Sequence, residues 1–134
     1  AGAFYDAGFR AGTIIARNKA AGTALAHRYG YAWAPEPGDL RAPVIVNVTP
    51  IGMSGGAESE QLAYPQPTIE AASVVFDVVA MPVETPLIRA ARAAGREVIT
   101  GGEVIALQAA EQFRLYTGVT LSPDDIAQAE AQAN

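Results

Sequence analysis

Several residue types are missing or scarce in this chain of 134 residues, and each absence removes a class of function. The chain has no cysteine, which excludes a disulfide framework and thiolate chemistry and fits a reducing compartment. His27 is the only histidine, and the carboxylates are scattered along the sequence. We therefore expect neither a metal site nor a catalytic Ser–His–Asp triad.

Positive charge is also scarce, and long apolar runs are absent. Nine basic residues face fourteen acidic ones, which gives a net charge of −5 without any basic cluster. Nucleic acid is therefore not an expected partner. No apolar run approaches the roughly 18 residues of a membrane-spanning helix, and no signal peptide is visible. Together with the lack of cysteine, these features predict a soluble cytoplasmic protein that does not bind a membrane.

What the chain does have is apolar residues, arranged as alternating strands and helices. Half of the residues are hydrophobic, enough for one domain with a core. The alternation predicts an α/β fold with a doubly wound parallel sheet. The expected strands are Gly12–Ala16, Tyr31–Trp33, Pro43–Val48, Ser73–Val79 and Glu97–Ile99. The expected helices are Lys19 to about Arg28, Pro86–Ala94, about Glu103 to Tyr116, and one opening at Ser122–Asp125, while Pro50–Pro67 is predicted to be mainly loop.

The clearest boundary lies between the strand that ends at Val79 and the helix that follows. Thr85 is a good N-cap residue, and Pro86 suits the first helical position. Gly95 stands where a glycine is expected to end that helix. Ligands of open α/β sheets bind beyond the carboxyl ends of the strands, so the intervening turn should face a ligand. Asp77 could act as an acid or base, but we expect its carboxylate to bind neighbouring loop amides.

The start of the chain differs from the start of a complete dinucleotide-binding domain. Such a domain begins with a strand, a Gly-rich turn and a helix whose N-terminus binds the pyrophosphate. Here residues 1–9 look like the tail of that helix, and no Gly-rich loop precedes Gly12. We predict a partial Rossmann-like sheet with helices on both faces, in which the first strand and the Gly-rich loop are missing. The alternative is a sheet that is completed in some other way.

Arg17 directly follows the first expected strand and is a candidate for nucleotide binding. At the corresponding strand end of a Rossmann sheet, an acidic residue binds the ribose of NAD and a basic residue suits the 2′-phosphate of NADP. Arg17, Asn18 and Lys19 offer a guanidinium group, an amide and an ammonium group to such a phosphate. The alternative is an ordinary solvated charge at a helix start, although a cation there opposes the helix dipole.

Further candidates follow the later strands. Asn47 and Thr49 could present an amide and a hydroxyl to a nicotinamide ribose, or Asn47 could end its strand with a side-chain-to-backbone bond. Gly101 and Gly102 permit a close approach of the backbone to a ligand. Gln108 lies on the following apolar helix, where it is either a satisfied core amide or a ligand contact.

Three motifs in order over most of the chain resemble the C-terminal, nucleotide-binding half of the shikimate dehydrogenases. They are Asn47–Met53, then Phe76–Val79 with Glu84–Leu87, and the C-terminal pattern within Gly101–Gly118. The resemblance is strongest to the shikimate dehydrogenase-like branch, through Ala16–Asn18, Tyr29–Ala32 and Val78–Pro86. Members of the family reduce 3-dehydroshikimate to shikimate with NADPH, so the resemblance implies NADP as the cofactor, with NAD possible.

The resemblance also implies roles for single residues. Arg17, with Ala16 and Asn18 beside it, matches the arginine that grips the 2′-phosphate, but Ala21 replaces a second basic residue. Val78 and Gly101 match positions that line the nicotinamide. Gln108 matches a glutamine that binds a substrate hydroxyl, and Ala80 stands where typical members carry a substrate-contacting tyrosine. Cofactor-binding residues are thus expected at Ala16, Arg17, Asn18, Asn47, Thr49, Val78 and Gly101.

The family's catalytic lysine and aspartate belong to an N-terminal substrate domain, which has no counterpart in this sequence. We therefore expect no catalytic residue here, and an inactive fragment whose intact parent acts on a small-molecule substrate. Without its first strand the sheet has an open edge, so we expect the fragment to associate with itself. The alternative is a stand-alone, non-catalytic nucleotide-binding or interaction module.

Overall fold

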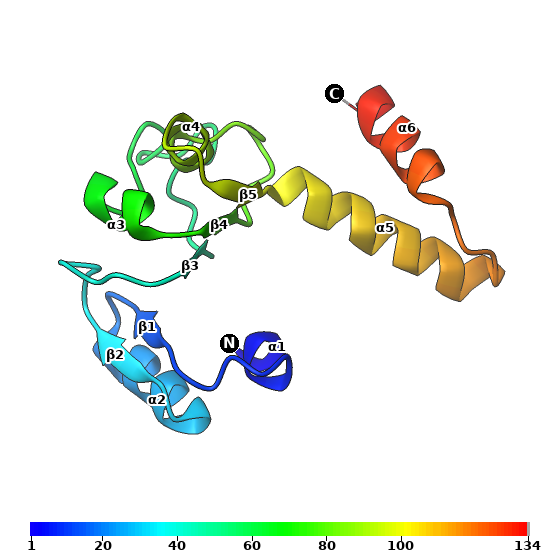
Figure 1. Cartoon of the computed structure of the whole chain (residues 1–134). Helices are drawn as coiled ribbons and strands as arrows, with labels where there is room; N and C mark the ends of the chain where they lie inside the picture. Colours follow the sequence, from blue (N-terminus) through cyan, green and yellow to red (C-terminus); the bar gives the residue numbers. More distant parts are fainter. Residues whose placement is uncertain (134) are drawn as a thin grey trace. The chain divides into compact units, whose positions relative to one another are not determined.

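The computed structural model describes residues 1–133, with only the backbone of Ala127 and of residues 130–133. It shows an α/β protein in which every strand pairing is parallel (Figure 1). The strands form one sheet of two and one sheet of three. The chain divides into two compact units, Ala1–Leu40 and the described residues from Arg41 onward. Each unit is described here by itself.

The first unit is a small βαβ unit preceded by a short helix. Its elements are α1 (Gly2–Asp6), β1 (Thr13–Ile15), α2 (Lys19–Tyr29) and β2 (Ala32–Ala34). Asn18 caps α2 by accepting a hydrogen bond from the Ala21 amide at 3.0 Å, and Gly30 ends the helix in the left-handed region with φ of 68°. The rings of Tyr5, Tyr29 and Tyr31 pack together and hold α1 against the unit.

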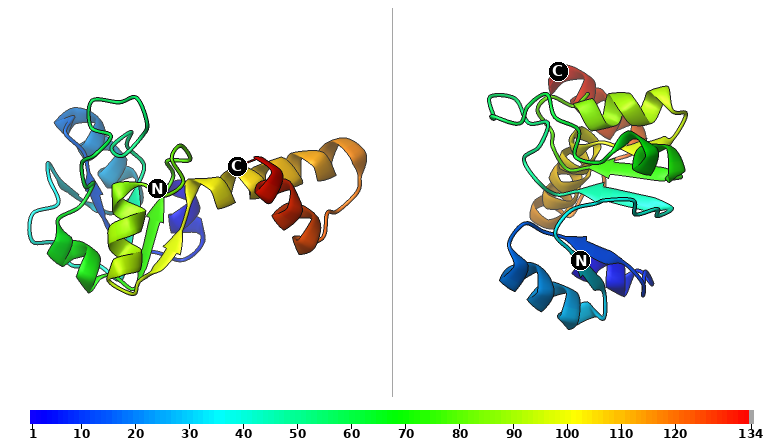
Figure 2. Two further views of the ribbon diagram at one scale, coloured as in Figure 1. Left: turned by 90° about the horizontal axis from the view of Figure 1, so that it is seen from above. Right: turned by 90° about the vertical axis from the view of Figure 1, so that its left-hand side faces the viewer.

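The second unit contains the three-stranded sheet, in the order β3–β4–β5 (Figure 2). Its elements are β3 (Val44–Asn47), α3 (Gln66–Ala71), β4 (Val74–Asp77), α4 (Pro86–Ala93), β5 (Glu97–Ile99), α5 (Gly101–Thr117) and α6 (Pro123–Ala133). No described helix is long and apolar enough to cross a membrane.

The core of the second unit lies between the sheet and helices α3 and α4. Because successive side chains of a strand point to opposite faces, Ile45 and Val75 share a face with the partly buried Val98. The buried residues that pack with Ile45 and Val75 come from α3, the residue after it, and α4: Ile69, Ala72, Leu87 and Ala91. The opposite face carries Val46, Phe76 and Ile99 in register, and Ile99 is 38% exposed.

The predicted strands and the predicted capped helix Pro86–Ala94 are all present, with ends shifted by up to a few residues. Thr85 caps α4 as expected, by accepting a hydrogen bond from the Ile88 amide. One helix was missed: α3 follows the predicted loop, because Pro65 and Pro67 mark a helix start here rather than a loop. Helix α5 begins at Gly101 instead of Glu103, since Thr100 and Glu103 form a capping box.

Candidate functional site

A buried polar network joins the carboxyl ends of β3 and β4, where ligands of parallel sheets bind. Asn47 and Asp77 are paired in register, and the Asn47 amide donates to Asp77 Oδ1 at 3.0 Å. Asp77 Oδ1 also accepts from the Val79 amide at 3.1 Å, and Oδ2 accepts from the Thr85 hydroxyl at 2.7 Å. The fully buried carboxylate therefore connects both strands to the start of α4. This confirms the expectation that Asp77 binds a neighbouring loop amide.

The side chain of Asn47 is saturated by partners within the protein. Its Nδ2 group donates to the Ile51 carbonyl at 3.2 Å as well as to Asp77. Its Oδ1 atom accepts from the backbone amide of Thr49 at 3.0 Å and from the Thr49 hydroxyl at 2.7 Å. Both amide protons and both lone pairs are thus in use. This favours the structural alternative for Asn47, and contact of Asn47 or Thr49 with a ribose stays a prediction.

Tyr64 binds the backbone of β3 beside this network. Its hydroxyl donates to the Val46 carbonyl at 2.7 Å. Burial raises the pKa of the Tyr64 phenol, and the negative charge of Asp77 acts in the same direction. The phenol therefore remains neutral and a donor at neutral pH, so this side chain is a structural support for β3.

Exposed apolar side chains directly follow β3 and β4 and occur in the loop after β4. Val78, directly after β4, is 39% exposed, and its amide donates to the Asn47 carbonyl at 3.1 Å. Val48 and Met81, in the neighbouring loops, are 73% and 74% exposed. Exposed apolar side chains at the ligand-binding edge of a sheet can contact a flat ring.

Gly101 is buried at the start of α5. A Cβ atom at Gly101 would lie 2.4 Å from the Val79 carbonyl oxygen and 2.7 Å from the Ala80 amide nitrogen. The predicted close approach of the backbone is present, but its partner is the loop after β4. Whether Gly101 also lines a nicotinamide stays a prediction.

The candidates of the first unit lie at the carboxyl end of β1. Ala16 is half-buried, whereas Arg17 and Asn18 are exposed. Asn18 has a structural role as the cap of α2, and Arg17 lies between β1 and that helix. Arg17 thus places a cation at the carboxyl end of a strand, where ligands of parallel sheets bind.

Trp33 is a residue that the sequence analysis missed. Its Nε1 group donates to the Ala16 carbonyl at 3.2 Å, directly before Arg17. The indole lies against Gly22 of α2, and the Lys19 ammonium is 5.8 Å from the ring centre. The signal that could have found it is a lone tryptophan that follows a helix with a glycine in its middle.

Gln108 lies on α5, two turns or about 10 Å along the helix from Gly101. It is exposed, so it is not a core amide. It lies on one open face of α5 with Val104, Leu107, Glu111 and Gln112. The contact of Gln108 with a ligand stays a prediction.

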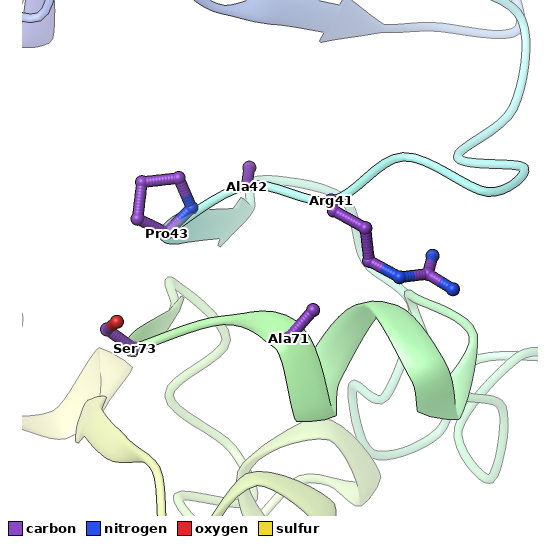
Figure 3. A pocket seen from close by; sticks show the side chains of 5 residues that line it. All are labelled: Arg41, Ala42, Pro43, Ala71 and Ser73. Carbon is purple, nitrogen blue, oxygen red and sulfur yellow. The ribbon is translucent and has the colours of Figure 1, made fainter.

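A second, shallow pocket of about 280 Å³ lies near the amino ends of β3 and β4. Figure 3 shows the segment Arg41–Pro43 on one side of it and Ala71 and Ser73 on the other. This is the opposite end of the sheet from Asn47 and Asp77, so it does not belong to the candidate site. Among the described residues, no group of His, Cys, Asp or Glu side chains could hold a metal ion.

Comparison with known proteins gives relatives along nearly the whole chain, although no protein-family model matches. The chain is 52% identical, over 131 residues and 98% of its length, to a shikimate dehydrogenase-like protein of Haemophilus influenzae. It is 36% identical over 83 residues to a shikimate dehydrogenase (NADP(+)) of Leptospira interrogans, which is 62% of this chain and 28% of that protein. It covers 48% of the Haemophilus protein, so the chain spans about half the length of that relative.

Solved structures show the same relationship. A shikimate 5-dehydrogenase-like protein matches with a TM-score of 0.92 and 52% identity over 96% of this chain and 48% of its own. The Thermus thermophilus shikimate 5-dehydrogenase, solved in complex with NADP(H) and shikimate, matches with a TM-score of 0.82 and 28% identity. That match covers 98% of this chain and 49% of the enzyme. The predicted fold class, a partial Rossmann-like α/β domain, is thereby confirmed.

Proposed function

Because this chain is homologous to the shikimate dehydrogenase family over nearly its whole length, we propose that it is the NADP-binding part of an oxidoreductase. The observation that supports this most is the exposed Arg17 at the carboxyl end of β1, directly before a capped helix. A guanidinium group in that place can bind the 2′-phosphate with two charge-assisted hydrogen bonds.

The hydrogen-bond donors and cations at the carboxyl end of β1 suit NADP, with NAD as a weaker ligand. Arg17 and Lys19 supply positive charge, and Asn18 orders the first turn of α2 by capping it. Ala21, in the same turn, adds no charge. We therefore propose a modest preference for NADP, in which Ala16 and Asn18 set the backbone from which Arg17 reaches the phosphate.

We assign the nicotinamide end to the carboxyl ends of β3 and β4. Val78 supplies an exposed apolar surface, and Gly101 lets α5 begin directly against the loop after β4. Asn47 and Thr49 act mainly by holding the loop after β3 through their mutual hydrogen bonds. When bound, the cofactor supplies or accepts the hydride, and the residues of this chain orient it.

The substrate and the catalytic groups belong, in this proposal, to a longer parent. The relatives are about twice as long, and we propose that residues 1–134 are the nucleotide-binding domain without a substrate domain. The parent would reduce 3-dehydroshikimate to shikimate, with Gln108 binding a substrate hydroxyl from α5. Among the described residues we assign no general base beside Val78 and Gly101, so the isolated chain should not oxidise shikimate.

We also propose that the isolated chain associates with itself through β3. This strand is at the end of the order β3–β4–β5, so in the described residues one of its edges has no strand partner. An unpaired apolar strand edge is a template for pairing with another chain. Sedimentation equilibrium should show a species larger than a monomer, and a strictly monomeric chain would contradict this part of the proposal.

The proposed function is tested by titrating the isotope-labelled chain with NADP⁺ and following its backbone amide signals by NMR. We expect shifts at Arg17, Asn18 and Lys19, and smaller ones at Val78. If the amide signals of these residues do not shift, the proposed nucleotide site is rejected. Measurable NADP-dependent oxidation of shikimate by the isolated chain would instead show that the catalytic groups lie within it.

A further inference from the structure

Trp33 anchors the strand end from which Arg17 extends. Strand β1 ends at Ile15, yet both backbone polar groups of the next residue, Ala16, are held. The Ala16 amide donates to the Ala34 carbonyl at 3.1 Å, and the Ala16 carbonyl accepts from Trp33 Nε1 at 3.2 Å. The indole therefore helps to fix the backbone of Ala16, the residue between β1 and Arg17.

Gly22 provides the space in which the indole lies. A Cβ atom at Gly22 would lie 2.4 Å from Trp33 Nε1, 2.5 Å from Trp33 Cδ1 and 2.9 Å from the Ala16 Cβ atom. Glycine is a poor helix former compared with alanine, and Gly22 is in the interior of α2. The seat of the indole gives a physical reason for a glycine at this position.

Arg17 is consequently one residue between two anchored neighbours. Ala16 is fixed on one side by Ala34 and Trp33, and Asn18 is fixed on the other side by its bond to the Ala21 amide. A side chain that extends from a fixed backbone loses less freedom when it binds a ligand. Lys19, whose ammonium lies over the Trp33 ring, keeps a second cation at the same strand end.

We infer that Trp33, seated against Gly22, is a positioning residue that sets the affinity of the Arg17 site for a 2′-phosphate. The inference rests on the proposed function, which places that phosphate at Arg17. Trp33 acts through the Ala16 carbonyl and does not itself bind the phosphate. Its loss should therefore weaken recognition of the 2′-phosphate without a similar effect on nucleotides that lack this group.

The experiment compares adenosine 2′-monophosphate with adenosine 5′-monophosphate as probes of the whole chain, with affinities from NMR amide shifts. Trp33→Phe keeps an aromatic ring and removes the N–H donor. It should weaken binding of the 2′-phosphate about threefold to tenfold, the effect of one lost hydrogen bond, and leave the 5′-phosphate unchanged. Gly22→Ala should have the same effect by displacing the indole, although alanine favours the helix.

Tyr31→Phe is the matched control. Tyr31 directly precedes β2, and its hydroxyl donates to the Phe9 carbonyl, so the variant also removes one side-chain donor but none that contacts Ala16. It should leave both affinities unchanged. If Trp33→Phe and Gly22→Ala bind the 2′-phosphate as the wild type does, the inference is wrong while the proposed function stands. An equal loss for both nucleotides, or for the control, would also overturn it. A wild-type chain that does not bind adenosine 2′-monophosphate at Arg17 would reject the proposed function and the inference together.

Discussion

Polar residues mark the carboxyl ends of β3 and β4 and also the segment after β1, but their surroundings differ. Asn47 and Asp77 are buried and bind each other, the adjoining loops and the cap of α4. Arg17 and Asn18 are exposed. The buried pair therefore orders the loops after its strands, whereas at the end of β1 the exposed Asn18 caps α2 and Arg17 is the proposed ligand contact.

The largest effect should follow from breaking the buried side of this comparison with Asp77→Ala. Three donors lose their acceptor, namely the Asn47 amide, the Val79 amide and the Thr85 hydroxyl. We expect the free energy of unfolding to fall by about 3 kcal/mol or more, since each unsatisfied buried donor costs roughly 1–3 kcal/mol. Urea denaturation followed by far-UV circular dichroism measures this. Asp77→Asn keeps one acceptor oxygen, so its free energy of unfolding should lie between those of the wild type and Asp77→Ala. A loss below about 1 kcal/mol for Asp77→Ala would show that the network is dispensable.

A smaller loss should follow from Gly101→Ala, which tests why the loop after β4 and α5 lie so close together. The new methyl group would meet the Val79 carbonyl oxygen at 2.4 Å, and only backbone movement can relieve that contact. We expect a loss of about 1–3 kcal/mol in the free energy of unfolding, as for other overpacked sites. Gly12→Ala is the control, because its Cβ atom would lie 3.5 Å from Tyr31, an ordinary contact. Equal stabilities of the two variants would show that α5 can shift at no cost.

The smallest effect concerns a polar pair that is entirely on the surface. Arg114 holds the pKa of the Glu111 carboxyl below its ordinary value, through hydrogen bonds at 2.6 and 2.8 Å. Since the folded pKa is depressed, the pair contributes stability above the unfolded value of 4.5 and loses it as the pH falls through the folded value. An NMR titration of the Glu111 side chain should show the low pKa, and Arg114→Ala should bring it back toward 4.5. An unchanged pKa in the variant would mean that the ion pair does not form in solution.

The sequence was sufficient to predict those helices and strands whose ends contain capping residues or prolines. Thr85 and Pro86 predicted the start of α4 correctly, because a capping side chain and a proline act locally. The same kind of mark was misread at Pro65–Pro67, where prolines that suit a loop also suit the first turn of a helix. The cytoplasmic location was a prediction from composition, and it stays one.

The candidate site was only partly predictable, because burial decides the role of its polar residues and depends on the whole fold. Asn47 was a candidate for ribose contact, and only its four hydrogen bonds, to Thr49, Ile51 and Asp77, reveal how fully it is used. Trp33 was missed, since its contact with Ala16 joins positions 17 residues apart in the sequence. Such contacts follow from the crossover of α2, and the glycine within that helix was their only local signal.

Recognition of the 2′-phosphate of NADP by Arg17 is tested by calorimetric titration of the wild-type chain and of Arg17→Ala. A charge-assisted hydrogen bond contributes roughly 1.5–3 kcal/mol, so the variant should bind NADP⁺ about tenfold to a hundredfold more weakly. Its affinity for NAD⁺, which lacks the 2′-phosphate, should stay nearly unchanged. Equal losses for both cofactors, or no loss for either, would contradict the claim.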